Sequence, residues 1–219
     1  MSENEDRPLW QQIRDAVAEG HVYYLNVPKS GDTDTKEYVN HIIQEGILTL
    51  GDWGLYDEAG TRFARDDEVV TSDTVTDHLA DPMAGRIDWD GLRDTLHEAV
   101  FAERGTKVRA GQVVAGIRRF VDEMSEGDLV LVRLPSGVVP AVIEGPPRYS
   151  LSSRSYELTS NQAFYRDVTW GRGTGGLIEI PRDSLPPGFG PGRQTVGKIS
   201  DPSPVVALLQ GLEWMGEQL

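Results

Sequence analysis

Cysteine is absent from this 219-residue chain. Without a thiol the protein can form no disulfide, no thiolate metal site and no cysteine nucleophile. Long apolar runs are missing as well, since no stretch approaches the roughly 20 apolar residues that a membrane-spanning helix needs. The first ten residues, MSENEDRPLW, lack the basic start and apolar centre of a signal peptide. We therefore expect a cytoplasmic protein with no membrane partner.

Positive charge is also scarce. The chain has 21 Lys and Arg residues against 35 Asp and Glu residues, which gives a net charge of −14. The acidic excess is spread along the chain, so bulk electrostatics repel nucleic acid and anionic membranes. Any contact with nucleic acid must therefore be local.

The chain has few of the motifs that mark catalytic or cofactor sites. Residues 171–176, GRGTGG, fit G-x-G-x-x-G, but a dinucleotide site needs a helix after this motif, and here a strand is predicted. The sequence contains no P-loop, no H-E-x-x-H and no G-x-S-x-G, and its histidines are scattered at His21, His41, His78 and His97. The sequence leaves a Ser-His-Asp triad open, because its members need not be neighbours in the chain. We predict that the protein is not an enzyme and has no cofactor, metal or catalytic residue.

Five short apolar runs predict a β-sheet. They are rich in Val, Leu, Ile or aromatic residues, and Gly and Pro punctuate the segments around them. In SEGDLVLVRLPSGVVPAVIEG two such runs flank a Pro-Ser-Gly turn, which indicates a β-hairpin. The predicted strands are Val22–Val27, Ile47–Leu50, Leu129–Leu134, Val138–Glu144 and Phe164–Trp170.

Helices are predicted where apolar residues recur at helical spacing. This pattern occurs in residues 8–18, within 33–46, and in 88–100 and 110–124. The last of these has the strongest apolar stripe, and we expect it to pack beneath the sheet. The stripe consists of Ile117, Phe120, Val121 and Met124.

The expected organisation is one barrel domain between two terminal helices. We expect an N-terminal helix in residues 1–20, the barrel in 21–200, and in 201–219 a helix that docks on the core. Residues 52–86 are acidic and aperiodic, which predicts a long surface excursion with room for a short helix near residues 72–80. The fold class is α+β, a small mixed β-barrel of five or six strands flanked by helices.

The order of these segments resembles that of a known family. The succession of VYYLNV, GILTLGDWGLYD, RRFVDEMSEGDLVLVRLPSGVVPAVIEGPPRY and FYRDVTW resembles the PUA-like modules related to EVE and YTH domains. More narrowly, it resembles the N-terminal reader module of Mrr-type and other modification-dependent restriction endonucleases. The likeness covers about Val22 to Ile199, and it implies a PUA-like barrel whose mouth takes a flipped or modified base. No nuclease motif follows, so the resemblance implies a reader without a nuclease, or part of a larger protein.

A reader of this kind binds nucleic acid without catalysis. We expect modified DNA as the partner, a role as the sensor of a restriction or defence system, and a separate nuclease or ATPase subunit as a further partner. Such a site needs aromatic groups that stack on the base, polar groups that contact its edges and arginines that hold phosphates. The expected base pocket is Tyr24, Asn26, Trp53 and Tyr56, and the expected phosphate-contacting rim is Arg148, Arg154, Arg166 and Arg172.

Two other interpretations stay open. The aromatic residues fit the core and rim of a barrel, and the arginines fit an ordinary exposed surface with ion pairs. The same barrel can also bind a small metabolite or a protein partner, with no nucleic-acid role and with the acidic surface as the interacting face.

Overall fold

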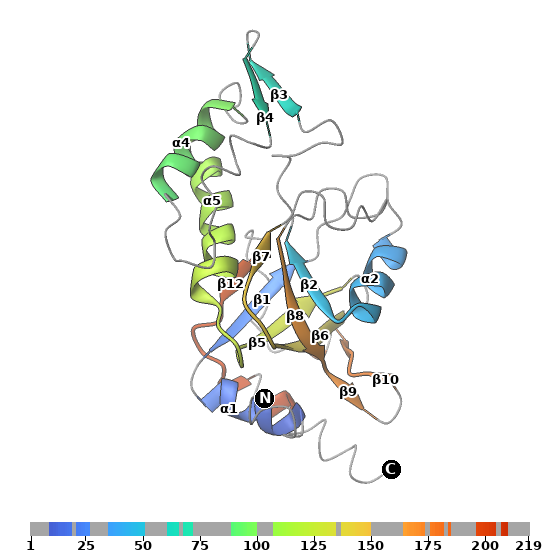
Figure 1. Ribbon diagram of the computed structural model, residues 1–219. Helices are drawn as coiled ribbons and strands as arrows, with labels where there is room; N and C mark the ends of the chain where they lie inside the picture. The colour runs from blue at the N-terminus through green and yellow to red at the C-terminus, as the bar shows by residue number, and fades with distance from the viewer. Residues whose placement is uncertain are drawn as a thin grey trace. The chain divides into compact units, whose positions relative to one another are not determined.

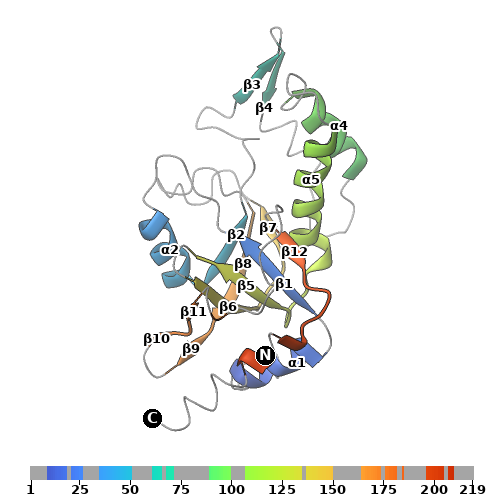
Figure 2. The same cartoon turned by 180° about the vertical axis from the view of Figure 1, so that it is seen from behind.

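The computed structural model contains one large mixed sheet, shown in Figures 1 and 2. Its strands are β1 Val22–Asn26, β2 Ile47–Leu50, β5 Leu129–Arg133, β6 Gly137–Ile143, β7 Arg148–Tyr149, β8 Phe164–Trp170, β11 Ile180–Pro181 and β12 Val196–Lys198. The strand order is β12-β1-β5-β6-β8-β2, with β11 beside β6 and β7 beside β8. The residues that the structure describes are 9–18, 21–26, 35–50, 61–65, 68–71, 89–99, 107–134, 137–149, 164–173, 176–181, 184, 196–204 and 207–209.

The five predicted strands are all present. β2 and β8 have the predicted bounds, β5 ends one residue early, and β6 begins and ends one residue early. β1 begins at the predicted Val22 and is described as far as Asn26. The sheet curls like half of a barrel, which confirms the prediction of a small mixed α+β fold at that level.

The pairing of β1 with β5 is parallel, whereas the other strand pairs whose register the structure describes are antiparallel. The register runs from Val22 opposite Leu129 to Asn26 opposite Arg133. Parallel neighbours cannot be joined by a tight hairpin, so the chain makes a long crossover between them. On its other side β1 pairs with β12, whose residues come near the end of the sequence.

The chain divides into two compact units. Unit 1 consists of Met1–Val27, Met124–Gly145 and Asp167–Leu219. Unit 2 consists of Pro28–Glu123 and Pro146–Arg166. The crossover between the parallel strands β1 and β5 therefore contains the larger segment of unit 2.

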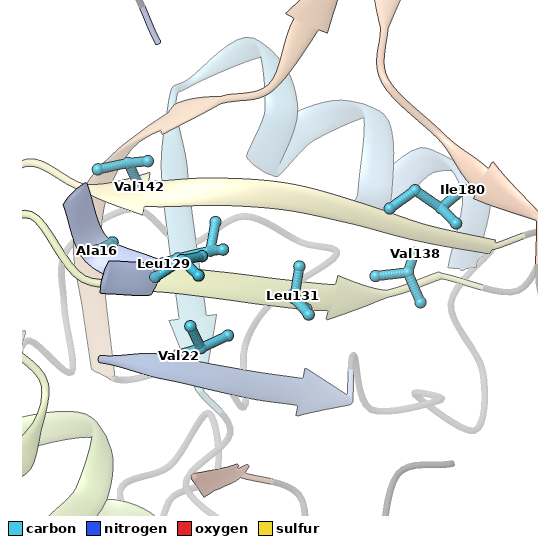
Figure 3. Packing of buried hydrophobic residues seen from close by; sticks show 8 residues of the cluster. Ala16, Val22, Leu129, Leu131, Val138, Val142 and Ile180 are labelled. Atoms are coloured by element: carbon cyan, nitrogen blue, oxygen red, sulfur yellow. The ribbon is translucent and has the colours of Figure 1, made fainter. Parts of the chain in front are cut away.

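In unit 1, one face of the sheet carries a cluster of buried aliphatic side chains. Figure 3 shows this cluster on β1, β5 and β6. The register places its members side by side, and we call this face the outer face. The residues that define it are Val22, Leu129, Leu131, Val138 and Val142.

Helix α1 (Leu9–Ala18) covers part of the outer face. Its residues Ala16 and Val17 belong to the buried cluster, together with Ile180 of β11. Leu208 and Leu209 pack against the same cluster, so the described part of the C-terminal helical segment contacts unit 1. The residues of β5 and β6 on the opposite face are buried as well, and burial on both faces explains why these strands are almost continuously apolar instead of alternating.

A capped turn begins the C-terminal helical segment. The Asp201 carboxylate accepts a hydrogen bond of 3.0 Å from the backbone N–H of Ser203. Hydrogen bonds from the side chain and the backbone of Ser203 lower the pKa of Asp201, because they favour the charged carboxylate.

Unit 2 contains the helices that the apolar spacing predicted. They are α2 Thr35–Gln44, α4 Trp89–Ala99 and α5 Lys107–Arg118, which continues as a π-helix, η2 Arg119–Glu123. α2 lies beside β2, and α4 packs on α5. The indole Nε1 of Trp89 donates a 2.8 Å hydrogen bond to Asp122, which ties the start of α4 to η2.

The acidic segment 52–86, which was predicted as a long surface excursion, contains a hairpin that the sequence analysis did not identify. An antiparallel hairpin of β3 (Thr61–Arg65) and β4 (Glu68–Thr71) lies within it. A register shift between Thr61 and Phe63 interrupts the ladder. The short helix expected near residues 72–80 lies outside the described residues.

Among the helices that the structure describes, none is long and apolar enough to span a membrane.

The predicted apolar stripe of α5 and η2 is buried, with Phe120 at 0% exposure. We expect Phe120→Ala to lower the free energy of unfolding by about 3–5 kcal/mol, because truncating a fully buried Phe leaves a cavity. Urea unfolding followed by far-UV circular dichroism measures the change. Val108→Ala in the same helix is the control, because Val108 is 69% exposed and its truncation should change stability by less than about 0.5 kcal/mol. Equal effects of the two substitutions would contradict the assignment of Phe120 to the core.

Candidate functional site

Two of the four predicted pocket residues lie within the described residues. Tyr24 and Asn26 are half-buried on β1. Tyr23, which precedes them, and Leu25, which lies between them, are buried. Because successive strand residues point to opposite faces, Tyr24 and Asn26 share the outer face with Val22. Trp53 and Tyr56 lie outside the described residues. The structure thus brings together the half of the predicted pocket that it describes.

The ring of Tyr24 lies against Gly197 of β12. The two residues are opposite each other in the antiparallel register. A Cβ atom built on Gly197 would collide with Cζ, Cε1 and the hydroxyl oxygen of Tyr24. The ring therefore occupies the space that any side chain at position 197 would need. A glycine opposite an aromatic residue is a known way to pack a ring onto a strand.

Arg133 extends the polar and aromatic group on this face. It ends β5, is half-buried and lies opposite Asn26 in the parallel register, as Leu131 lies opposite Tyr24. Partners in neighbouring strands point to the same face, so Tyr24, Asn26 and Arg133 share the outer face. The ring of Tyr24 extends over β12 on one side of β1, and Arg133 stands on β5 on the other side. We call Tyr24, Asn26 and Arg133 the β1–β5 site. It lies at the carboxyl ends of two parallel strands, a position that often holds ligands in open α/β sheets.

A histidine–aspartate pair fixes the opposite end of these two strands. Nδ1 of His21 lies 3.0 Å from Oδ1 of Asp128, whose side chain is 3% exposed. Asp128 also accepts a 2.8 Å hydrogen bond from the backbone N–H of Ser125, and the backbone N–H of Leu129 donates to the carbonyl of His21 at 3.1 Å. These bonds join the segment before β1 to the turn before β5. The pair therefore stabilises the pairing of β1 with β5.

Arg166 was predicted on an exposed rim, and the structure corrects its position. Its side chain is buried at 2% exposure, because Arg166 shares a face of β8 with Phe164, Val168 and Trp170. Its Nε donates to the carbonyl of Phe120 at 2.8 Å and a terminal nitrogen to the carbonyl of Val121 at 2.9 Å. The guanidinium thus satisfies carbonyl groups of η2 that a helix terminus leaves without intrahelical partners.

The other predicted rim arginines have different surroundings. The guanidinium of Arg148 lies 5.2 Å from the ring centroid of Tyr165, its register partner on β8, in a cation–π contact. Arg172 is exposed on β9 (Arg172–Gly173), which pairs with β10 (Gly176–Leu177). This pair confirms that GRGTGG belongs to a hairpin and is not followed by a helix. Arg154 lies outside the described residues.

The sequence did not identify Arg133 as a neighbour of Asn26, and it did not identify His21 and Asp128 as a contacting pair. The available signal for Arg133 was its place at the end of an apolar run, like Asn26. No local signal links His21 to Asp128, because their contact depends on the pairing of strands that are far apart in sequence. Within the described part of the chain, no three His, Asp or Glu side chains gather as possible metal ligands.

No family model matches the chain, and the searches of curated proteins and of solved structures also found no match.

Replacing Arg166 tests its role in the fold. We expect Arg166→Met to lower the free energy of unfolding by about 2–5 kcal/mol, because two buried carbonyl groups lose their donors. Arg166→Lys should recover only part of this loss, since an ammonium group lacks the planar fork of a guanidinium. Thermal and urea unfolding measure both. Arg172→Met is the control, because it removes the same charge from an exposed position. If Arg166→Met changes the free energy of unfolding as little as Arg172→Met does, the guanidinium of Arg166 lies in solvent.

Proposed function

We propose that the protein is a non-catalytic nucleic-acid-binding module of the PUA-like kind, which contacts a base through the β1–β5 site. The observation that carries the proposal is the placement of an aromatic ring, an amide and a guanidinium on one face of two adjacent strands. The order of sequence segments that resembles PUA-like readers supports it. On this proposal the partner is DNA with a modified base, and the protein is the sensor of a defence system whose nuclease or ATPase is a separate subunit.

Each group of the β1–β5 site has a distinct task in this proposal. The ring of Tyr24 stacks on the base, a contact worth about 1–3 kcal/mol per base. The amide of Asn26 contributes its oxygen Oδ1, which is buried in the free protein, as an acceptor for the edge of the base. The guanidinium of Arg133 binds either a phosphate or the acceptor edge of a purine. Trp53 and Tyr56 remain predicted additions to the same surface.

The net charge of −14 limits how such a module can bind. Long-range attraction to the phosphate backbone is unfavourable, so affinity has to come from short-range stacking and hydrogen bonds. Of the predicted rim arginines, Arg166 is engaged with backbone carbonyls and Arg148 with an aromatic ring. Because these two guanidinium groups make contacts within the protein, the affinity depends more on contacts to the base than on contacts to phosphates.

A screen of oligonucleotides with modified cytosines and adenines tests the proposal. We expect Tyr24→Leu to weaken binding about tenfold to a hundredfold, because leucine still covers Gly197 but cannot stack. Tyr24→Phe keeps the ring and should bind nearly as well as the wild-type protein. Fluorescence anisotropy at low and high salt measures the affinity.

The same screen distinguishes a direct contact of the Arg133 guanidinium from a general effect of net charge on binding. Arg133→Ala should weaken binding about fivefold or more, as expected for the loss of a charge-assisted hydrogen bond. Arg172→Ala removes the same charge from an exposed hairpin and should leave binding nearly unchanged. If no oligonucleotide binds, or if Tyr24→Leu and Arg133→Ala bind like the wild-type protein, the β1–β5 site does not contact nucleic acid. A metabolite or protein partner is then the better hypothesis.

A further inference from the structure

We propose that the C-terminal part of unit 1 is a strap that regulates the β1–β5 site. The strap consists of β12 and the described residues that follow it, 196–204 and 207–209. When the strap is closed, Gly197 holds the ring of Tyr24 in place, and when it opens, the ring is released while the rest of unit 1 stays folded. The inference rests on the proposed function, because it concerns the regulation of the same site.

The position of β12 in the sheet allows the strap to open alone. β12 stands at the end of the strand order, and its register with β1 covers three residues, whereas the register of β1 with β5 covers five. Within the described sheet, opening β12 therefore breaks one ladder and leaves the pairings of β1 with β5 and of β5 with β6 intact. The contact of His21 with Asp128 also stays in place. Elements whose opening breaks few contacts open at a lower free energy than the core.

After β12 the strap is held by half-buried side chains. Ile199, Leu208 and Leu209 pack against the cluster on the outer face, and the helical part of the strap lies beside α1 (Figure 2). Ile199 also donates its backbone N–H to the carbonyl of Val22 at 2.8 Å. The cluster residues Val22 and Leu129, by contrast, are fully buried. Because half-buried side chains lose less apolar contact when they become exposed, the strap is held less strongly than β1, β5 and β6.

The closed strap determines where the ring of Tyr24 lies. A Cβ atom built on Gly197 would collide with Cζ and the hydroxyl oxygen of Tyr24, so the ring lies across the backbone of β12. On the opposite face, Nζ of Lys198 lies 5.7 Å from the ring centroid of Tyr23. Two successive residues of β1 thus contact β12 from its two faces. Without β12 the side chain of Tyr24 is free to change its rotamer, and the entropy lost on ordering it again opposes binding.

Binding at the β1–β5 site and closing of the strap are therefore coupled. A ligand that prefers the closed form shifts the strap toward that form, and closing the strap raises the affinity by the same factor. The apparent affinity falls in proportion to the closed fraction, so that a closed fraction of about one tenth weakens binding about tenfold. Any change that opens the strap is thus expected to weaken binding at the site.

Hydrogen exchange in the wild-type protein tests whether the strap opens alone. NMR follows the backbone amide of Ile199, and for comparison the amides of Leu129 and Ile143, which donate to the carbonyls of His21 and Asp128. We expect the Ile199 amide to exchange at least about a hundredfold faster than the other two, after correction for intrinsic rates, because local opening needs less free energy than global unfolding. Equal corrected rates would show that β12 opens only with the whole of unit 1 and would overturn the inference.

A charge placed on β12 tests whether the strap holds the ring. Val196 is 0% exposed, so a carboxylate in Val196→Asp is solvated only when β12 leaves the sheet. Ala207→Asp adds the same charge at an exposed position of the strap and is the control. Nitration by tetranitromethane, located by peptide mass spectrometry, should be at least about threefold faster at Tyr24 in Val196→Asp than in the control, and unchanged at Tyr165 of unit 2. Unchanged nitration of Tyr24 together with fast exchange of the Ile199 amide would overturn the role of the strap.

Binding measurements separate this inference from the proposed function. Val196→Asp should bind the tightest oligonucleotide of the screen at least about tenfold more weakly than Ala207→Asp, and this oligonucleotide should slow the exchange of the Ile199 amide in the wild-type protein. If the two variants bind alike although nitration shows an open strap, the proposed function stands and the regulation fails. If no oligonucleotide binds, the proposed function fails, and exchange and nitration still decide whether the strap opens and holds Tyr24. Should Val196→Asp unfold, which faster nitration of Tyr165 would reveal, the exchange of Ile199 with and without the oligonucleotide decides the inference.

Discussion

The parallel pairing of β1 with β5 is the constraint on which the rest of unit 1 depends. It brings Tyr24 beside Leu131 and Asn26 beside Arg133, although these residues are far apart in the chain. A slip of one residue would turn every side chain of β1 to the other face, which would exchange Tyr24 and Asn26 for the buried Tyr23 and Leu25. The hydrogen bond between Leu129 and His21 and the contact of His21 with Asp128 hold this register at one end. Packing of Val22 under α1 holds the same region from the outer face.

Two arginines of this acidic protein make specific contacts within the fold. Arg166 binds two carbonyl groups inside the protein, and Arg148 lies over an aromatic ring. A guanidinium group suits both positions, because it is planar, offers several donors and is less strongly hydrated than an ammonium group. The chain has only four lysines, so arginine supplies most of its positive charge. An arginine in this sequence is thus not by itself a sign of a surface that binds phosphate.

The sequence predicted the positions of helices and strands better than it predicted which strands pair. Runs such as Leu129–Arg133 and Phe164–Trp170 were recognisable because burial on one or both faces demands an apolar pattern. The buried position of Arg166 could also have been predicted, since it alternates with Phe164 and Val168 in the same strand. The parallel neighbour of β1 could not, because strand pairing depends on long-range contacts that leave no local pattern. For the same reason the contact of Tyr24 with Gly197 was not foreseeable from the two short segments that contain them.

The sequence order of unit 1 has a consequence for biosynthesis. β1 is made early, but its partners β5 and β12 follow only after residues 128 and 195 have been added. During translation the apolar strand Val22–Asn26 leaves the ribosome well before either neighbour is available. Unit 2 lies mostly in one continuous segment, Pro28–Glu123, so it can begin to form before β1 has a neighbouring strand. An apolar segment without its neighbouring strands can pair with other chains, so its exposure favours aggregation until β5 and β12 have been added.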